Sequence, residues 1–519
     1  MALRTAANIT ATRTRAERRR LAEQPGEPFP LGRRQRAQLP FPQEMQRTTM
    51  VALVALLTLA ALAIDLQVTH GLSVDEILAV DQAETSLGGL IRELAHGVKP
   101  PLHPVLVWVA VHLLGSGDFA VRLPSLLAGV ALVPATAALA RELFDRRTAV
   151  LAALLAALAP IVVWYSQEVS PYELVALFGA LTVLGAVRAR RRGAPEDWAL
   201  HTVAAALAVW SSWSGIFIVV ASELILLERL IPVASAGPDG AERRRLLLAW
   251  GLDTLGLAIQ FLALGWLLSD QLSAAGSLAG LASVGASGPS FYTAVSNVSW
   301  ALFGFHPAAV TDALSAVWPL GMLASLLMIG RRLSPRTWLL LVCVLIPALG
   351  TLLLGLWVPA AFDVRYALAG VPAGVVLVAR IITGVGPGRL PRLAAALAAC
   401  LIFAAALVDQ QLDRANPRRY DYRPALAQVQ RGAGPSTAVF YAPPELRVVL
   451  ARDAAGLRAR PLGRRLPTRA QAREVVLLSS FTGRPSVRAL LNRDLGALRA
   501  TRRLVGYRSY PGVDVWWFR

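Results

Sequence analysis

The sequence carries little charge and few cysteines. Only 16% of its 519 residues are Asp, Glu, Lys or Arg, whereas 55% are hydrophobic and the mean hydropathy is +0.51. A soluble chain of this length carries more charge, so the composition predicts a polytopic membrane protein. The two cysteines, Cys343 and Cys400, lie inside apolar segments, which excludes a disulfide framework and a cysteine metal site.

Lysine is almost absent: Lys99 is the only one. Arginine supplies the remaining positive charge. A net charge of +19 raises the hypothesis of nucleic-acid binding. However, no basic groove with interleaved aromatic residues accompanies the charge, and we expect no nucleic-acid partner. The arginines gather at the ends of apolar segments, which is typical of cytoplasmic loops. The arginine-, alanine- and leucine-rich composition indicates a bacterial source.

The first 49 residues are polar, basic and proline-containing. They lack an apolar segment followed by a small-residue cleavage site, so we expect no cleaved signal peptide. We predict that residues 1–49 form a disordered cytoplasmic tail.

Residues 50–408 contain about eleven apolar segments that we predict to be transmembrane helices. The predicted spans are 50–66, 119–143, 148–165, 170–187, 198–211, 215–231, 246–268, 312–330, 337–357, 366–382 and 393–408. The apolar segment 102–114 has about 13 residues, whereas a crossing needs roughly 20, so we predict a helix lying at the outer surface. If segment 102–114 does not cross the membrane, every later basic cluster lies on the cytoplasmic side.

The same topology places four polar segments outside. They are the first loop (residues 67–118), Gln167–Glu168, the Gly- and Ser-rich loop 270–311, and Asp363–Arg365. Residues 409–519 also lie outside and alternate short strand-like and helical segments, which predicts a small soluble α/β domain. The predicted fold class is therefore an all-α polytopic membrane protein with a C-terminal α/β domain.

Two carboxylates open the helical part of the first loop. Asp75 and Glu76 follow Ser73, a good helix N-cap residue, so they are either a solvated pair or part of a helix start. The functional alternative is a general base at the membrane surface, where partial burial tunes a carboxylate.

Three cations lie on the predicted outer side. Lys99 precedes two prolines, and Arg122 and Arg365 each begin a span against the positive-inside trend. They are either snorkelling and headgroup contacts or a binding site for a phosphate.

A polar group also ends the third span. Tyr165, Gln167 and Glu168 lie where an apolar helix stops, and ionisable residues at such depth usually face a cavity. His103 and His306 are the histidines nearest the outer face, but no histidine pair has metal-ligand spacing. No ligand set requires a cofactor, although Asp75 and Glu168 are candidates for a divalent cation.

Six short motifs occur in a specific order along the chain. They are Val74-Asp75-Glu76, Lys99-Pro100-Pro101-Leu102, Phe119–Ser125, Leu143–Arg147, Trp164–Glu168, and Arg365-Tyr366 followed by Pro372. Between about residues 50 and 408 this set resembles the GT-C superfamily of integral membrane glycosyltransferases. The nearest branch is that of the bacterial protein-mannosyltransferase-like and aminoarabinose-transferase-like proteins.

The resemblance implies a transferase of the bacterial plasma membrane that uses a polyprenyl-phosphate-linked sugar on the extracytoplasmic face. Asp75 matches the family's base in the first external loop, and Glu76 matches its acidic neighbour. Lys99, Arg122 and Arg365 would stabilise the leaving phosphate, with Tyr165, Gln167, Glu168, His103 and Tyr366 as further cavity residues. The acceptor would be a glycan, lipid or protein hydroxyl.

The chain departs from the family in two places. Many relatives carry His in place of Lys99, and they often carry Arg-Met in place of Ser170-Pro171. A transporter or flippase of lipid-linked sugars is the alternative function, but it should show internal repeats, and we find none. A membrane scaffold would leave the outer polar residues unexplained.

Overall fold

A computed structural model describes most of the chain. The described residues are 43–66, 70–96, 100–230, 240–267, 289–329, 334–357, 362–384, 388–413, 420–462, 468, 470–480 and 485–519. Residues 1–49 form one unit and Met50–Arg519 the other. The predicted tail lies almost entirely outside the described residues, as does Lys99.

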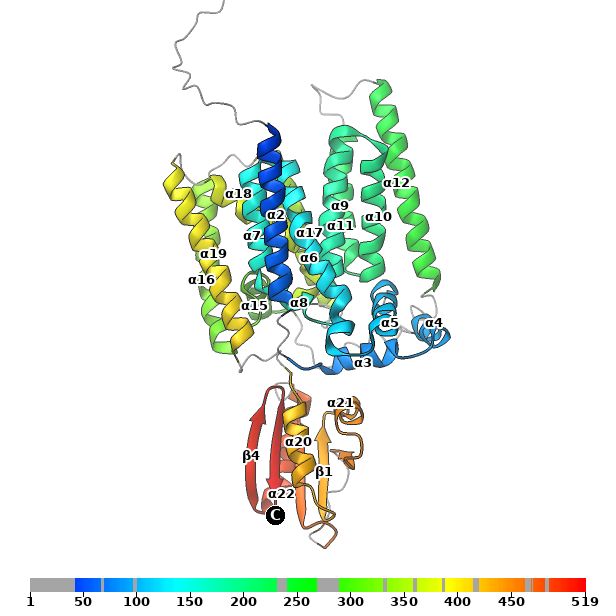
Figure 1. Ribbon diagram of the computed structural model, residues 1–519, viewed down its shortest axis with the longest axis vertical. Coiled ribbons are helices and arrows are strands. Elements are labelled where there is room, and N and C mark those ends of the chain that lie inside the picture. Colours follow the sequence, from blue (N-terminus) through cyan, green and yellow to red (C-terminus); the bar gives the residue numbers. More distant parts are fainter. Residues whose placement is uncertain are drawn as a thin grey trace, which may run out of the picture. The chain divides into compact units, whose positions relative to one another are not determined.

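Helices occupy every predicted span (Figure 1). Seven candidate spans among the described residues are long and apolar enough to cross a membrane. These seven are α2 (Gln43–Asp65), α6 (Asp118–Leu143), α9 (Tyr172–Arg192), α12 (Gly240–Leu267), α17 (Pro335–Trp357), η3 (Val364–Gly370) continued by α18 (Val371–Gly384), and α19 (Arg389–Leu412). Three further predicted spans coincide with α10 (Pro195–Ser211), α11 (Gly215–Leu230) and α16 (Ala308–Ile329).

The remaining predicted span, 148–165, is bent. α7 (Arg146–Leu158) and α8 (Pro160–Ser166) meet at 56°, and Ala159 between them has an extended backbone. Pro160 explains the break, because proline has no backbone N–H and clashes with the preceding turn. The Gln410 side chain donates to the Pro160 carbonyl at 2.8 Å, so α19 holds the break from the side.

The first loop is helical. α3 (Val74–Ala83), α4 (Leu87–His96) and α5 (Leu102–Leu114) lie together at one end of the long helices (Figure 1). α5 has 13 residues, the short helix that the sequence predicts. The predicted outer segment 270–311 contains a helix in its described part, α15 (Phe291–Phe303), while residues 270–288 lie outside the described residues. Ser290 caps α15 through Thr293, a signal hidden by the Ser-rich composition around it.

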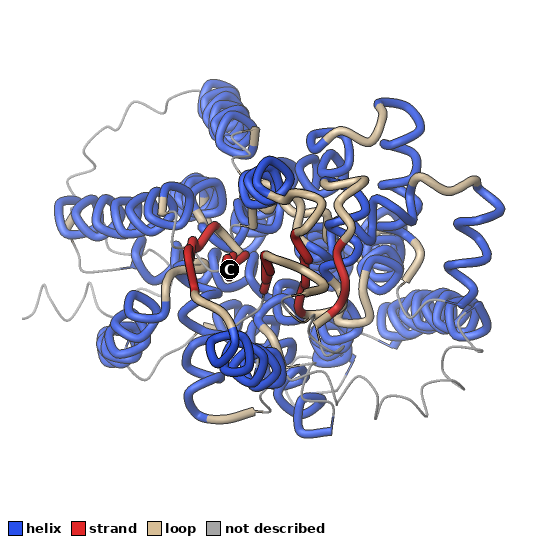
Figure 2. Tube along the Cα trace, turned by 90° about the horizontal axis from the view of Figure 1, so that it is seen from below, coloured by secondary structure: helices blue, strands red, loops and turns tan. Residues whose placement is uncertain are grey.

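The C-terminal segment is α/β, as predicted. Its elements are α20 (Arg423–Gly432), β1 (Thr437–Ala442), α21 (Leu446–Asp453), β2 (Ala459–Pro461), β3 (Glu474–Ser479), α22 (Pro485–Thr501), β4 (Leu504–Tyr510) and β5 (Val513–Phe518). The five strands form one sheet in the order β2-β1-β3-β5-β4. β1 pairs in parallel with β2 and β3, while β5 pairs antiparallel with β3 and β4. Figure 2 shows these strands side by side.

Apolar burial stabilises the molecule, and two clusters are the largest among the described residues. The first lies among the long helices, with Leu139, Leu155 and Val183 fully or almost fully buried. The second joins α3 and α5 of the first loop to the C-terminal segment, through residues such as Ile77 and Leu446. The first loop is therefore packed between the long helices and the sheet, rather than solvated. The predicted domain boundary at residue 409 stays a prediction.

Candidate functional site

The start of α3 separates the two predicted carboxylates. Ser73 N–H donates to Glu76 Oε2 at 2.8 Å, and Glu76 N–H donates to Ser73 Oγ at 3.3 Å. This reciprocal capping box turns the Glu76 side chain back toward the helix start, where it is buried. Asp75 lies one residue earlier and is exposed. Neighbours in sequence thus have opposite environments.

Glu76 is the centre of a buried polar network. Its Oε1 lies 3.2 Å from Arg122 Nη2 and accepts from the Val169 N–H at 3.0 Å. Burial raises the pKa of Glu76, but the positive charges of Arg122 and His70 and two backbone N–H groups outweigh it, so the pKa lies below its usual range. Glu76 therefore ties together the first loop, α6 and the segment after α8.

Arg122 is fully buried in this network. Besides Glu76, it donates to the Gly71 carbonyl at 3.0 Å, and its Nη2 lies 3.3 Å from His70 Nδ1. A charge-paired arginine held by several hydrogen bonds is well placed to fix the loop. Its predicted role at a donor phosphate stays a prediction.

Tyrosines surround Arg365 at the start of η3. The Arg365 guanidinium carbon lies 5.2 Å from the Tyr366 ring centre and 6.0 Å from that of Tyr172. Tyr172 also contacts Tyr165 edge-on at 5.4 Å, so the structure brings three predicted residues together. Tyr172 itself was not predicted. Its place directly after Pro171, in the same polar junction as Gln167, is the signal that would have found it.

The polar end of α8 makes structural contacts. Gln167 is buried, donates to the Ile64 carbonyl at 3.2 Å and accepts from the Gln411 side chain at 3.1 Å. Glu168 is half-buried and accepts from Trp164 Nε1 at 2.7 Å. His103 is buried in the first turn of α5. These contacts join α2, α8 and α19 beneath the first loop.

A tyrosine from the C-terminal segment also packs in the core with α3. Tyr422, at the start of α20, is buried in the core shared with α3. Burial raises the pKa of the Tyr422 phenol, and the nearby carboxylates of Asp75 and Glu76 raise it further. No local sequence pattern indicates this contact, because about 340 residues separate Tyr422 from α3.

A second carboxyl pair, which the sequence did not predict, lies where α2 ends and α9 begins. Asp65 is buried and accepts from Ser166 Oγ at 3.0 Å. Glu173 is fully buried, interacts electrostatically with Asp65, and has no hydrogen-bond partner for either carboxyl oxygen among the described residues. Gly129 permits this close packing, since a Cβ there would lie 2.5 Å from Ser166 Cβ.

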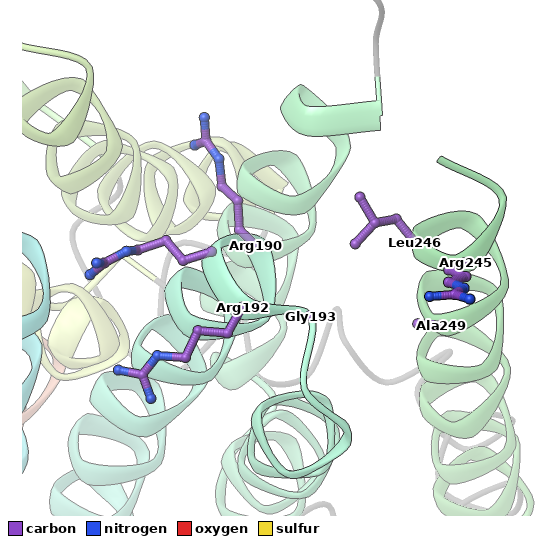
Figure 3. Close-up of a pocket in the computed structure, with 7 residues that line it drawn as sticks. Arg190, Arg192, Gly193, Arg245, Leu246 and Ala249 are labelled. Atoms are coloured by element: carbon purple, nitrogen blue, oxygen red, sulfur yellow. The ribbon is translucent and has the colours of Figure 1, made fainter. Parts of the chain in front are cut away.

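The opposite ends of the helices are arginine-rich. A cavity of about 230 Å³ lies between α9 and α12, and Figure 3 shows Arg190 and Arg192 pointing away from Leu246. Arg190 pairs with Glu228 at 2.9 Å and Arg192 with Glu142 at 3.0 Å. Because these arginines already have carboxylate partners, the cavity is not favoured as the reaction site.

Comparisons with known proteins agree with the fold. The family described as dolichyl-phosphate-mannose-protein mannosyltransferase matches residues 98–231. The apo structure of ArnT from Cupriavidus metallidurans is 14% identical, with a TM-score of 0.55 over 91% of this chain and 98% of that chain. ArnT bound to undecaprenyl phosphate is 13% identical, with a TM-score of 0.53 over the same shares.

The family match and the ArnT-like fold both support the predicted resemblance to the GT-C superfamily. The archaeal oligosaccharyltransferase AglB from Archaeoglobus fulgidus has a TM-score of 0.48, with 14% identity over 91% of this chain and 74% of that chain. No curated protein matches the sequence significantly. The predicted fold class is confirmed, and the predicted family resemblance is supported over residues 98–231.

Proposed function

We propose that this GT-C protein is a membrane glycosyltransferase. It would move a sugar from a polyprenyl-phosphate donor to a hydroxyl acceptor on the extracytoplasmic face of the bacterial plasma membrane. The proposal rests on one observation above all: Asp75 is exposed on a helix start that Glu76 and Arg122 fix in place. A base needs both access to the substrate and a defined position.

The proposed reaction is a single displacement at the sugar's anomeric carbon. The acceptor oxygen forms a bond to that carbon while the bond from the carbon to the phosphate oxygen breaks. Asp75 takes the acceptor's proton, and the polyprenyl phosphate leaves with the electron pair. Charge develops on the leaving phosphate, so nearby cations lower the barrier.

Arg365 is the described residue best placed for the phosphate. Its side chain is partly exposed and its guanidinium lies against two tyrosine rings, with Asp363 3.5 Å from its Nε. This packing limits its rotamers and leaves less entropy to lose on binding. Lys99 and Arg122 are proposed as further donor residues, with Tyr165, Gln167, Glu168, His103 and Tyr366 lining the cavity. The solved ArnT complex with undecaprenyl phosphate supports a lipid-phosphate donor for this fold.

The acceptor is proposed to be a cell-envelope glycan, a glycolipid or a protein hydroxyl. A divalent cation between Asp75 and Glu168 is a further proposal for the same site. Carboxylate oxygens are suitable ligands for a hard cation.

The test is transfer from a purified polyprenyl-phosphate sugar in nanodiscs, with donor binding followed separately. We expect Asp75→Asn to bind the donor and to transfer poorly. Arg365→Ala should weaken donor binding, with Arg147→Ala as a matched control at the opposite helix ends. Full activity in both Asp75→Asn and Glu76→Gln would contradict the mechanism and favour the alternative, a flippase of lipid-linked sugars.

A further inference from the structure

Three ionisable residues meet inside the helices α10, α11 and α12, apart from the first loop. His201 is fully buried, Asp253 is 4% exposed, and the Glu223 side chain is 24% exposed. One ligand atom from each lies within 4.8 Å of the others. Ionisable groups at membrane depth are costly and usually have a function.

The hydrogen bonds of Ser222 indicate where the imidazole proton lies. The Ser222 hydroxyl has one hydrogen, and it donates to the Val219 carbonyl at 2.8 Å. Its oxygen is 3.0 Å from His201 Nε2 and therefore accepts the Nε2 proton. This arrangement leaves Nδ1 of a neutral imidazole with a lone pair, directed at a carboxylate.

Both oxygens of Asp253 lie 3.0 Å from His201 Nδ1. A lone pair and a carboxylate repel each other at this distance, so either a second imidazole proton or a bound cation lies between them. Equal distances to the two oxygens fit chelation of one cation better than a single linear hydrogen bond. Thr202 Oγ1 donates to Asp253 and holds the carboxylate in this orientation.

Glu223 completes the set. Trp250 Nε1 donates to its Oε2 at 2.8 Å, while Oε1 has no hydrogen-bond partner among the described residues. That Oε1 lies 3.9 Å from the imidazole at Nε2, and it belongs to the group in which one ligand atom of each of the three residues lies within 4.8 Å of the others. A tryptophan that holds one carboxylate oxygen leaves the other available as a ligand, which is how outer contacts orient metal ligands.

The charges decide the class of ligand. A neutral imidazole and two carboxylates sum to −2, and a divalent cation brings the cluster to neutrality inside the membrane. We propose that His201, Glu223 and Asp253 bind a divalent transition-metal ion such as Zn²⁺. One nitrogen and two carboxylate ligands suit Zn²⁺, and the partial exposure of Glu223 offers an entry path.

The ion would fasten α12 to its neighbours. α12 packs on its neighbours along one side only, because Leu257 and Leu264 are buried there whereas Leu252, Leu255 and Leu262 are exposed. The proposed role is structural, and it does not depend on the proposed glycosyl transfer.

The test uses the purified full-length protein in detergent, stripped with EDTA and then given ZnCl₂. We expect one bound Zn²⁺ per chain by mass spectrometry of the metal, and a higher unfolding temperature with Zn²⁺ than with EDTA. His201→Gln and Asp253→Asn should abolish Zn²⁺ binding. Ser222→Ala removes only the partner of Nε2 and should weaken binding by about 10- to 100-fold.

His306→Gln is the matched control. His306 Nδ1 lies 2.6 Å from Asp409, so it is also a His–Asp pair, but it is not in the three-residue cluster. This variant should bind Zn²⁺ like the natural protein. The proposal is overturned if the natural protein binds no Zn²⁺ and EDTA does not change its unfolding temperature. Two protons would then neutralise the two negative charges of the cluster. Equal binding in His201→Gln would also overturn the proposal.

Discussion

Glu76 in the first loop and Glu173 at the start of α9 are both buried, but their electrostatic surroundings differ. Glu76 has Arg122 at 3.2 Å and two backbone N–H donors, so its negative charge is fully compensated. Glu173 interacts electrostatically with Asp65, a second acidic group, and no described group donates a hydrogen bond to it. Equal burial thus accompanies opposite electrostatic environments.

The difference shows what a buried carboxylate needs in order to stay charged. An ionised carboxylate without a partner is costly in a low-dielectric interior, so Glu173 is expected to carry its proton. Glu76 can remain ionised and hold three segments in place, because hydrogen bonds and Arg122 replace the water that it loses. Glu76 positions neighbouring groups, whereas Glu173 only fills space between helices.

The largest expected effect comes from Asp75, the exposed neighbour of Glu76. Asp75→Asn removes the proposed base and should lower the transfer rate by about 10²- to 10⁴-fold. The unfolding temperature should stay close to that of the natural protein, since Asp75 is exposed. Transfer kinetics and thermal unfolding in the same nanodiscs check both expectations. A normal rate would remove Asp75 from the mechanism.

Breaking the Arg122–Glu76 ion pair should have the second largest effect. Arg122→Gln leaves the Glu76 charge buried and unpaired, which should destabilise the fold by about 3–5 kcal/mol. The double variant Arg122→Gln/Glu76→Gln should recover part of the loss, because it removes the orphaned charge. Reversible unfolding with denaturant measures both, and a double variant no better than the single one would show that charge is not the cause.

A substitution of Glu173 should do little. Glu173→Gln replaces a protonated carboxyl with a neutral amide of similar shape, so we expect a stability change below about 1 kcal/mol. Glu76→Gln under identical conditions is the contrast and should lose far more. A loss from Glu173→Gln as large as that from Glu76→Gln would mean that Glu173 is charged and has a cationic partner.

The smallest expected effect is on the pH dependence of folding stability. The pKa of folded Glu76 lies below its usual 4.5, so its carboxylate stabilises the fold above that pH. This contribution should be lost as the pH falls through the lower, folded value. The stability difference between the natural protein and Glu76→Gln should therefore be constant above pH 4.5 and shrink in more acidic buffer. A difference that grows on acidification would reverse the assignment.

Much of the helical fold was predictable from the sequence, because membrane spans require long apolar segments whatever their tertiary contacts. The short helix α5 and the capping residue Ser73 were also found, since both depend on local sequence. The bend at Pro160 was missed, as was α15, where the residues resemble a polar loop. Strands β2 and β4 are difficult to predict from the sequence, because β2 is three residues long and β4 is largely exposed.

The site was only partly predictable. Sequence order pointed to Asp75, Glu76, Arg122 and Arg365, but not to which of them pair. The ion pair of Glu76 with Arg122 and the core that Ile77 shares with Tyr422 join distant segments, and no single sequence states such pairings. Likewise, His201, Glu223 and Asp253 lie on three helices and show no ligand spacing. Their roles remain predictions that the variants above test.

The core shared by α3 and the C-terminal segment has a consequence for synthesis of the chain. Roughly 340 residues separate Ala83 from Tyr422, so α3 leaves the ribosome long before its apolar partners in the C-terminal segment exist. At about 5–20 residues per second the interval is roughly 20–70 s. During that time Ile77 and Val80 lack the part of their cover that the C-terminal segment later supplies. Newly made chains should therefore need a chaperone or the membrane surface to shield this helix until translation ends.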